Sequence, residues 1–259
     1  MNAVQWVARW LSRLLPRQER AHPWENYPLA PETRVILQLA AGDALGYDQL
    51  HATPERVLLA ALEDEAVEAW LRDGTPGAVE AAREALLPVL ASPAVAAEAR
   101  AGAPSPRVGH MLSHAFERTR RRGATVMSRG DLVAGLGATE GETARLLAGC
   151  ALRAVLDVSP RDDLPEEAEV EDAEVAVYVL NDDTSTMEDV LHILAHGFDL
   201  PGRRAYHRML TTHYRGRAHV GTYPRARAEE RLAEATRHAA ERFCLIRFHR
   251  GKVLGPPYR

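Results

Sequence analysis

The sequence predicts two domains, an all-α domain with a doubled helical pattern over residues 31–157 and an α+β domain over residues 175–259. Three observations support this division. A helical pattern that contains Leu37 recurs 75 positions later around Leu112. An acidic stretch, residues 158–174, separates the two regions. After it, the expected order is strand, helix, helix, strand, helix, strand, which is typical of a small antiparallel sheet with helices on one face.

Length and composition exclude several classes of protein. A chain of 259 residues suits two ordinary domains, and a net charge of −4 gives no electrostatic support to nucleic-acid binding. Cys150 and Cys244 are too few for a zinc ligand set or a disulfide framework, so we expect a cytoplasmic protein without a metal or other cofactor. No apolar run is long enough to span a membrane.

Residues 1–30 are expected to form a basic amphipathic segment followed by a linker at 22–28. The apolar residues of the segment recur at helical spacing: Val4, Val7, Leu11 and Leu14. Arg9 and Arg13 interrupt the apolar centre that a signal peptide requires. A helix that docks on this protein or on a partner is the simpler interpretation, and a helix on a membrane surface is the alternative.

Each half of the first domain should contain a helix, a short connection and a capped helix. Thr53 in the first half and Ser128 in the second occupy N-cap positions, and Pro54 stands at the first helical position, where its missing N–H costs nothing. Neither half can bury its apolar face alone, so we expect the two halves to pack against each other.

This doubled pattern resembles the N-terminal domain of Clp-family AAA+ unfoldases. The stretches that carry the resemblance are TPERVLLAALED at 53–64 and RVGHMLSHAFERTRRRGATVMSRGDLVAGL at 107–136. In that family the domain precedes ATPase modules. The sequence printed here has no GxxxxGK[ST] loop to hold nucleotide phosphates, and no set of catalytic side chains, so we expect no enzymatic activity.

The acidic stretch at 158–174 also contains two prolines. Because like charges repel and prolines stiffen a chain, it should form an extended tether between the domains.

The second domain is expected to contain six elements. They are a strand at 175–180, a helix at 186–196, a helix at 201–214, a strand at 216–223, a helix at 224–241 and a strand at 243–248. The loop at 181–186 consists of short polar residues, which by themselves suit a turn and a helix cap as well as a binding site.

Three separated stretches of this domain resemble ClpS, the adaptor that recognises N-degrons, the N-terminal residues that mark a protein for degradation. They are VYVLNDDTSTMEDVLHIL at 177–194, MLTTHYRGRAHVGTY at 209–223 and FCLIRF at 243–248. The resemblance implies a non-enzymatic adaptor for proteins that begin with Leu, Phe, Tyr or Trp. It also implies delivery of those proteins to a Clp AAA+ protease, whose unfoldase N-domain would be the docking partner.

The resemblance also implies which residues bind the degron. Asn181, Asp182 and His213 would contact the α-amino group, which is mostly an ammonium at neutral pH and needs acceptors. The apolar cavity for the first side chain would be lined by the following residues: Val179, Met187, Met209 and Thr212, with Ser185 at the rim. Methionine suits such a wall because it adapts to guests of different shape.

Some positions depart from the family pattern. Thr212 replaces an aliphatic residue and would bring a hydroxyl into the cavity, which leaves the preferred first residue open. Ala226 stands where family members carry an acidic residue for docking on the unfoldase. The resemblance also implies that the last strand contributes one residue to the pocket, and Cys244 would be that residue.

The sequence leaves further alternatives open. The protein could instead be a regulatory or scaffold protein that competes for unfoldase N-domain contacts without a working degron pocket. Its two domains could contact each other, within one chain or between chains, or could stay independent. His192 and His196, four positions apart on a helix, could hold a metal, but a solvated face is the simpler interpretation because no third ligand is in view.

Overall fold

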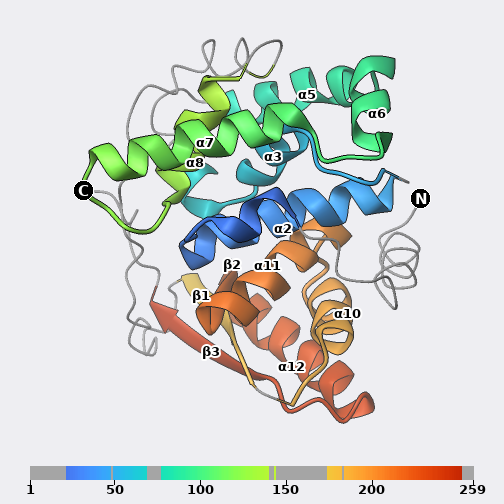
Figure 1. The fold of residues 1–259 in the computed structure, drawn as a ribbon. Coiled ribbons are helices and arrows are strands. Elements are labelled where there is room, and N and C mark those ends of the chain that lie inside the picture. The colour runs from blue at the N-terminus through green and yellow to red at the C-terminus, as the bar shows by residue number, and fades with distance from the viewer. Residues whose placement is uncertain are drawn as a thin grey trace. The chain divides into compact units, whose positions relative to one another are not determined.

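A computed structural model describes residues 22–47, 49–68, 77–139, 143, 174–182 and 184–252, shown in Figure 1. These residues form two compact units, a helical unit before residue 158 and an α+β unit after residue 159. The amphipathic segment at 1–21 and the acidic tether at 158–173 lie outside the described residues. Within the described ranges, no helix is both long enough and apolar enough to cross a bilayer.

The helical unit repeats its helices at the predicted spacing. Its elements are η1 (Pro23–Asn26), α2 (Pro31–Gly46), α3 (Pro54–Ala61), α5 (Ala78–Leu90), α6 (Pro93–Arg100), α7 (Pro106–Arg121) and α8 (Arg129–Gly137). Helices α2 and α7 begin at residues 31 and 106, and α3 and α8 begin at residues 54 and 129, so both pairs are 75 positions apart. Helix α3 packs on α2 as α8 packs on α7.

The two predicted N-caps behave differently. The Ser128 hydroxyl accepts a hydrogen bond from the Asp131 N–H, and the Asp131 carboxylate accepts one from the Ser128 N–H, which completes a capping box. The Thr53 hydroxyl is buried and has no hydrogen-bond partner among the described residues. The equivalent of Asp131 in the first half is Arg56, which instead donates to the Gln49 side chain at 2.6 Å and cannot close a capping box.

Residues 22–28, expected to be a linker, pack on the helical unit. Trp24 is only 1% exposed, and η1 contacts α7. The chain then runs parallel to the segment before α8, where Leu29 pairs with Met127 and the Met127 N–H donates to the Pro28 carbonyl at 2.8 Å. The buried Trp24 indole and the backbone pairing of Leu29 with Met127 therefore make this stretch part of the helical unit.

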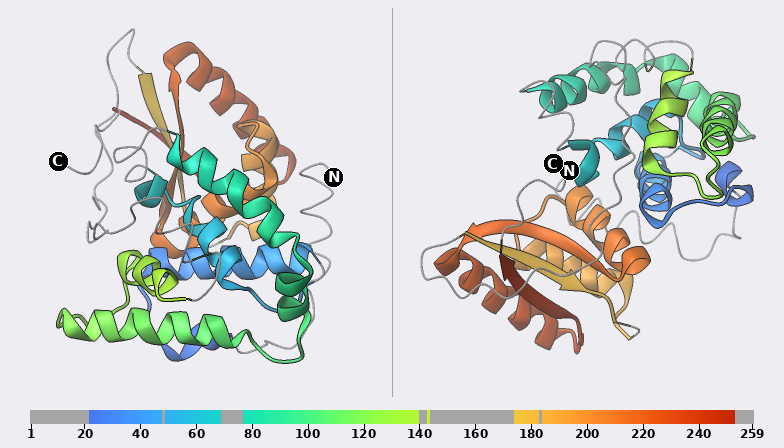
Figure 2. Two further views of the ribbon diagram at one scale, coloured as in Figure 1. Left: turned by 90° about the horizontal axis from the view of Figure 1, so that it is seen from above. Right: turned by 90° about the vertical axis from the view of Figure 1, so that its left-hand side faces the viewer.

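The α+β unit has the predicted order of elements. They are β1 (Glu174–Leu180), α10 (Met187–Gly197), α11 (Gly202–Arg215), β2 (Arg217–Pro224), α12 (Arg225–Glu241) and β3 (Arg247–Lys252). The sheet is antiparallel with the order β2-β1-β3, so β1 lies at its centre. The helices cover one face of this sheet (Figure 2), which confirms the predicted α+β class.

The last strand was predicted in the wrong place, because β3 begins at Arg247 and not at Phe243. Phe243 has a φ of 54°, in the left-handed region, and ends α12. The Phe243 N–H donates to the Ala240 carbonyl and the Cys244 N–H donates to the Ala239 carbonyl, the two bonds of a Schellman motif. The apolar run that suggested a strand is therefore a helix stop followed by a turn.

Close packing fixes the helices against the sheet. Val175, Val177 and Val179 alternate along β1 and are all almost fully buried. Helices α10 and α12 cross at Gly197, where an added Cβ would lie 2.6 Å from the Ala235 Cα. Glycine is needed at this crossing because the backbones approach too closely for any side chain.

Three histidines meet on the side of this crossing. The rings of His192 and His196 stack with centroids 4.0 Å apart, and His238 of α12 lies 5.3 Å and 5.7 Å from them. Among the described residues, no group of three or more His, Cys, Asp or Glu side chains, this trio included, is placed to hold a metal ion. Burial lowers the pKa of His192 to about 4, helped by the charges of His196, Arg242 and His238 and opposed by Asp189.

This lowered pKa predicts that the α+β unit loses stability on acidification from about pH 6.5 to pH 4. In that range the unfolded chain binds a proton at His192 and the folded chain does not, so protons favour unfolding. The free energy of unfolding would be measured in urea at several pH values from NMR intensities of β1 amides. His192→Gln should flatten the pH slope, whereas His110→Gln on α7 should not. An unchanged slope in the His192 variant would contradict this prediction.

Candidate functional site

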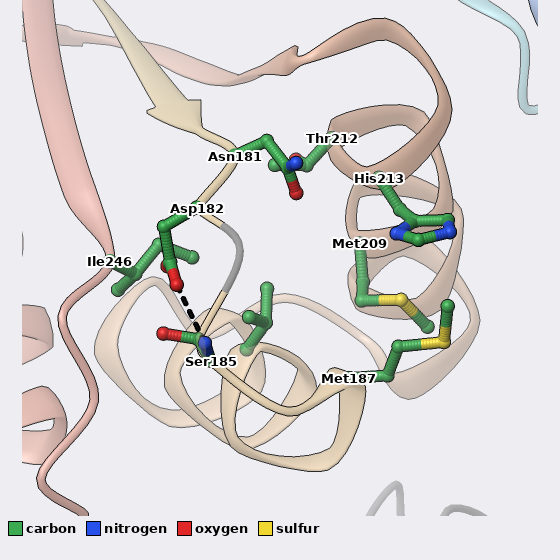
Figure 3. A pocket seen from close by; sticks show the side chains of 9 residues that line it. Asn181, Asp182, Ser185, Met187, Met209, Thr212, His213 and Ile246 are labelled. Atoms are coloured by element: carbon green, nitrogen blue, oxygen red, sulfur yellow. Dashed lines mark hydrogen bonds between the residues drawn. The ribbon is translucent and has the colours of Figure 1, made fainter.

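A small pocket lies where four parts of the α+β unit meet, as Figure 3 shows. It is bounded by the end of β1, the first turn of α10, the last turns of α11 and the residue before β3. The lining residues are Asn181, Asp182, Ser185, Met187, Val190, Met209, Thr212, His213 and Ile246. The fold therefore brings together residues that lie up to 65 positions apart in the sequence.

All of the predicted site residues except Val179 line this pocket. Val179 is fully buried in β1 and belongs to the core of the unit. Two lining residues were missed, Val190 and Ile246. The signal for Val190 was its position one helical turn after Met187. Ile246 was hidden by the misplaced last strand.

The polar loop both forms a turn and lines the pocket. One oxygen of Asp182, Oδ1, accepts hydrogen bonds from the backbone N–H groups of Thr184 at 2.8 Å and Ser185 at 2.6 Å. Such an Asx turn holds the chain in a tight bend. Thr186 then caps α10 by accepting from the Asp189 N–H at 3.1 Å. The bend directs Asp182 and Ser185 toward the same cavity (Figure 3).

Asp182 carries a negative charge at any pH near neutrality. Burial acts to raise its pKa, but the hydrogen bonds from Ser185 and Thr184 outweigh this effect and lower the pKa to about 2. Its second oxygen, Oδ2, is buried and has no hydrogen-bond partner among the described residues. A buried carboxylate oxygen without a donor is costly, so the site is suited to a ligand that donates.

Two further side chains that can accept hydrogen bonds, those of Asn181 and His213, line the same pocket. The Asn181 N–H donates to the Gly216 carbonyl at 2.7 Å, which ties the end of β1 to the turn after α11. His213, in the last turn of α11, is exposed and lies edge-on to the Tyr214 ring. In Figure 3 the Asn181 amide lies between Asp182 and His213. Figure 3 marks no hydrogen bond from the side chain of Asn181 or His213 to another of the pocket residues that it draws.

The rest of the wall is apolar. Met209, Val190 and Ile246 are buried, whereas Met187 is 39% exposed at the mouth. Met187 and Met209 lie on the same side of the pocket in Figure 3. Methionine side chains are flexible enough to reshape this side around different guests.

Thr212 lines the pocket as expected, but its hydroxyl is hydrogen-bonded within its own helix. It donates to the Arg208 carbonyl of its own helix at 2.8 Å. Its one donor is therefore satisfied within α11. Cys244, to which the sequence assigned a place in the wall, instead donates its thiol to the Ser185 hydroxyl at 3.0 Å.

Comparison with known proteins assigns this unit. The family model described as ATP-dependent Clp protease adaptor protein ClpS matches residues 170–244. The ATP-dependent Clp protease adapter protein ClpS of Vibrio atlanticus is 36% identical over 86 residues, 32% of this chain and 81% of that protein. The ClpS of Vibrio cholerae is 33% identical over 87 residues, 32% of this chain and 82% of that protein. The ClpS of Roseobacter denitrificans is 41% identical over 58 residues, 22% and 51% respectively.

The family match lies within the part of the chain that contains the pocket, and it does not include the helical unit. The matching family is described as a Clp protease adaptor, which confirms the expectation of a non-enzymatic adaptor. Through its C-terminal unit, this chain belongs to the ClpS family of ATP-dependent Clp protease adaptors.

Proposed function

We propose that this protein recognises the N-terminal residue of other proteins and delivers them to a Clp AAA+ unfoldase. The observation that carries the proposal is the pairing, in one pocket, of a charged acceptor with an apolar wall. Asp182 offers a buried oxygen that has no hydrogen-bond partner among the described residues, and Met187 and Met209 provide adaptable apolar surface. Only the first residue of a chain combines an ammonium group with a side chain on the same Cα atom.

The proposed ligand matches the pocket group by group. The ammonium has three donors, which Asp182, Asn181 and His213 can accept. A Leu, Phe, Tyr or Trp side chain would pack against the two methionines, where burial of one such side chain contributes about 1.5–3 kcal/mol. Charge-assisted hydrogen bonds contribute about 1.5–3 kcal/mol each before the entropy of association is subtracted. At the favourable end of these ranges, with about 4 kcal/mol subtracted for association, the affinity is about 1 μM.

The bond from the Thr212 hydroxyl to Arg208 supports the same substrate class. Because that hydroxyl is satisfied inside α11, Thr212 presents no unpaired donor to the cavity. A first residue with an apolar side chain therefore meets no unsatisfied donor at this point of the wall.

We further propose that the helical unit is a module like the N-domain of Clp unfoldases. The 75-residue repeat, which extends to the helix boundaries, supports this assignment. Such a module would place an unfoldase-like docking surface on the same chain as the adaptor. The alternative function is a regulatory or scaffold protein that competes for unfoldase contacts. Ala226 favours this alternative, because it stands where family members carry an acidic residue for docking on the unfoldase.

Peptide binding tests the proposed function. Fluorescence anisotropy would compare labelled peptides that begin with Phe, Leu or Ser, each with a free or an acetylated amino group, against the full chain. We expect binding of the free Phe and Leu peptides and none of the acetylated forms, because acetylation removes the charge and two of the three donors. Equal binding of free and acetylated peptides would exclude the pocket as a reader of N-termini and would leave the scaffold alternative.

A further inference from the structure

The turn between α12 and β3 carries two exposed apolar side chains next to the pocket. Phe243 is 93% exposed and Leu245 is 69% exposed. The residues around them belong to the pocket region, since the Cys244 thiol donates to the Ser185 hydroxyl and Ile246 lines the cavity. Scattered apolar side chains on a surface are ordinary, but two of them at the border of a binding pocket indicate a contact surface.

The backbone at Phe243 strengthens this argument. Its φ of 54° places it in the left-handed region at the position that follows a helix, where glycine is the usual residue. A residue with a Cβ atom is disfavoured in that conformation. The phenylalanine does not pack in the core either, so the stability of the fold gives no reason for its presence.

We propose that Phe243 and Leu245 form a second contact site, which covers an apolar side chain at the second or third residue of the bound peptide. The inference rests on the proposed function, because it requires the first residue to occupy the pocket. Phe243 lies three residues before Ile246, so at most about 10 Å of chain separates it from the pocket wall. An extended peptide advances about 3.3 Å per residue, so its second and third residues come within reach of this turn.

The test uses the full chain and a set of peptides that begin with Phe and carry Leu or Ser at the second and third positions. Anisotropy should show that Leu at one of these positions tightens binding by about five- to tenfold, the effect of covering a few apolar groups. Phe243→Gly should abolish this advantage without weakening the Ser peptide. It should also raise Tm, because glycine suits the left-handed position, so a loss of binding cannot be attributed to unfolding.

Two control variants complete the design. Phe243→Tyr keeps the ring and should keep the preference for Leu, and Leu87→Ser, which removes an exposed leucine from α5, should also keep it. Equal affinity for the Leu and Ser peptides, or an unchanged preference in Phe243→Gly, would overturn the second contact site while first-residue selectivity stayed intact. Failure of every free-amino peptide to bind would instead overturn the proposed function, and this inference with it.

Discussion

Replacing Asp182 with alanine is expected to weaken binding of a Phe-first peptide by about 10- to 150-fold, or about 1.5–3 kcal/mol. The substitution removes the one carboxylate of the pocket lining and leaves the ammonium of the peptide with neutral acceptors only. It also removes the acceptor of the Thr184 and Ser185 N–H groups, so part of the loss would come from the turn. Asp182→Asn separates these effects, because its carbonyl oxygen can keep the turn while the charge is lost.

Titration curves of the labelled peptide would give Kd for the parent and for each variant. The matched control is Glu188→Gln, which removes an exposed carboxylate one residue after Met187 but does not touch the pocket. We expect Asp182→Asn to bind more weakly than the parent and the control to bind like it. If Asp182→Ala binds as tightly as the parent, the carboxylate has no part in holding the amino group.

The pH dependence of binding gives a second view of the same interaction. With a pKa of about 2, Asp182 stays ionised from pH 4 upward, and its turn loses stabilisation only as pH falls from about 4 toward 2. The α-amino group of a peptide has a reference pKa of about 7.7–8.0, so its charge disappears as pH rises through 8. Peptide binding should therefore weaken above pH 8. Binding by Asp182→Asn should weaken less over the same pH range, because this variant has already lost the attraction between carboxylate and ammonium.

Most of the pocket could be predicted because its residues lie at the ends of predicted elements. Met209, Thr212 and His213 share one face of α11 through helical spacing, and Asn181 follows directly on a strand. Ile246 could not be predicted in the same way. Its position depends on where α12 stops, and the stop signal there is a left-handed Phe243, a residue type that normally gives no such signal.

The fold of the helical unit could likewise be predicted only in part. The repeat could be predicted from periodicity and capping residues, which act within one turn of the chain. The docking of residues 22–28 could not, because it depends on a single buried Trp24 and on a backbone pairing between Leu29 and Met127, far apart in sequence. Local chemistry sets helix boundaries, whereas the contacts between distant segments emerge only from the packed structure.

Another long-range contact, between Arg129 and Asp64, is expected to make a large contribution to the stability of the helical unit. The Arg129 guanidinium, at the start of α8, donates to both oxygens of Asp64 at 2.9 and 3.2 Å. The side chains are only 4% and 8% exposed. Arg129→Met would leave the Asp64 carboxylate buried without this cation, and breaking one partner of a buried pair costs about 3–5 kcal/mol. Urea unfolding of the helical unit would measure the loss.

A double-mutant cycle distinguishes the ion pair from general damage to packing. Asp64 also accepts the N–H groups of Ala66 and Val67, so Asp64→Ala has a cost of its own. If loss of the ion pair causes most of the destabilisation, the double variant should lose less stability than the two single variants added together. The control is Arg121→Met, which breaks an exposed pair with Glu117 and should cost about 1 kcal/mol or less.

The pair joins the first half of the repeat to the second, since Asp64 follows α3 and Arg129 opens α8. Loss of the cation should therefore loosen both halves together, because neither buries its apolar face alone. A cost for Arg129→Met no larger than that of the Arg121 control would contradict this view. In that case the apolar contact of the two halves would hold the unit together, and the ion pair would serve only to align them.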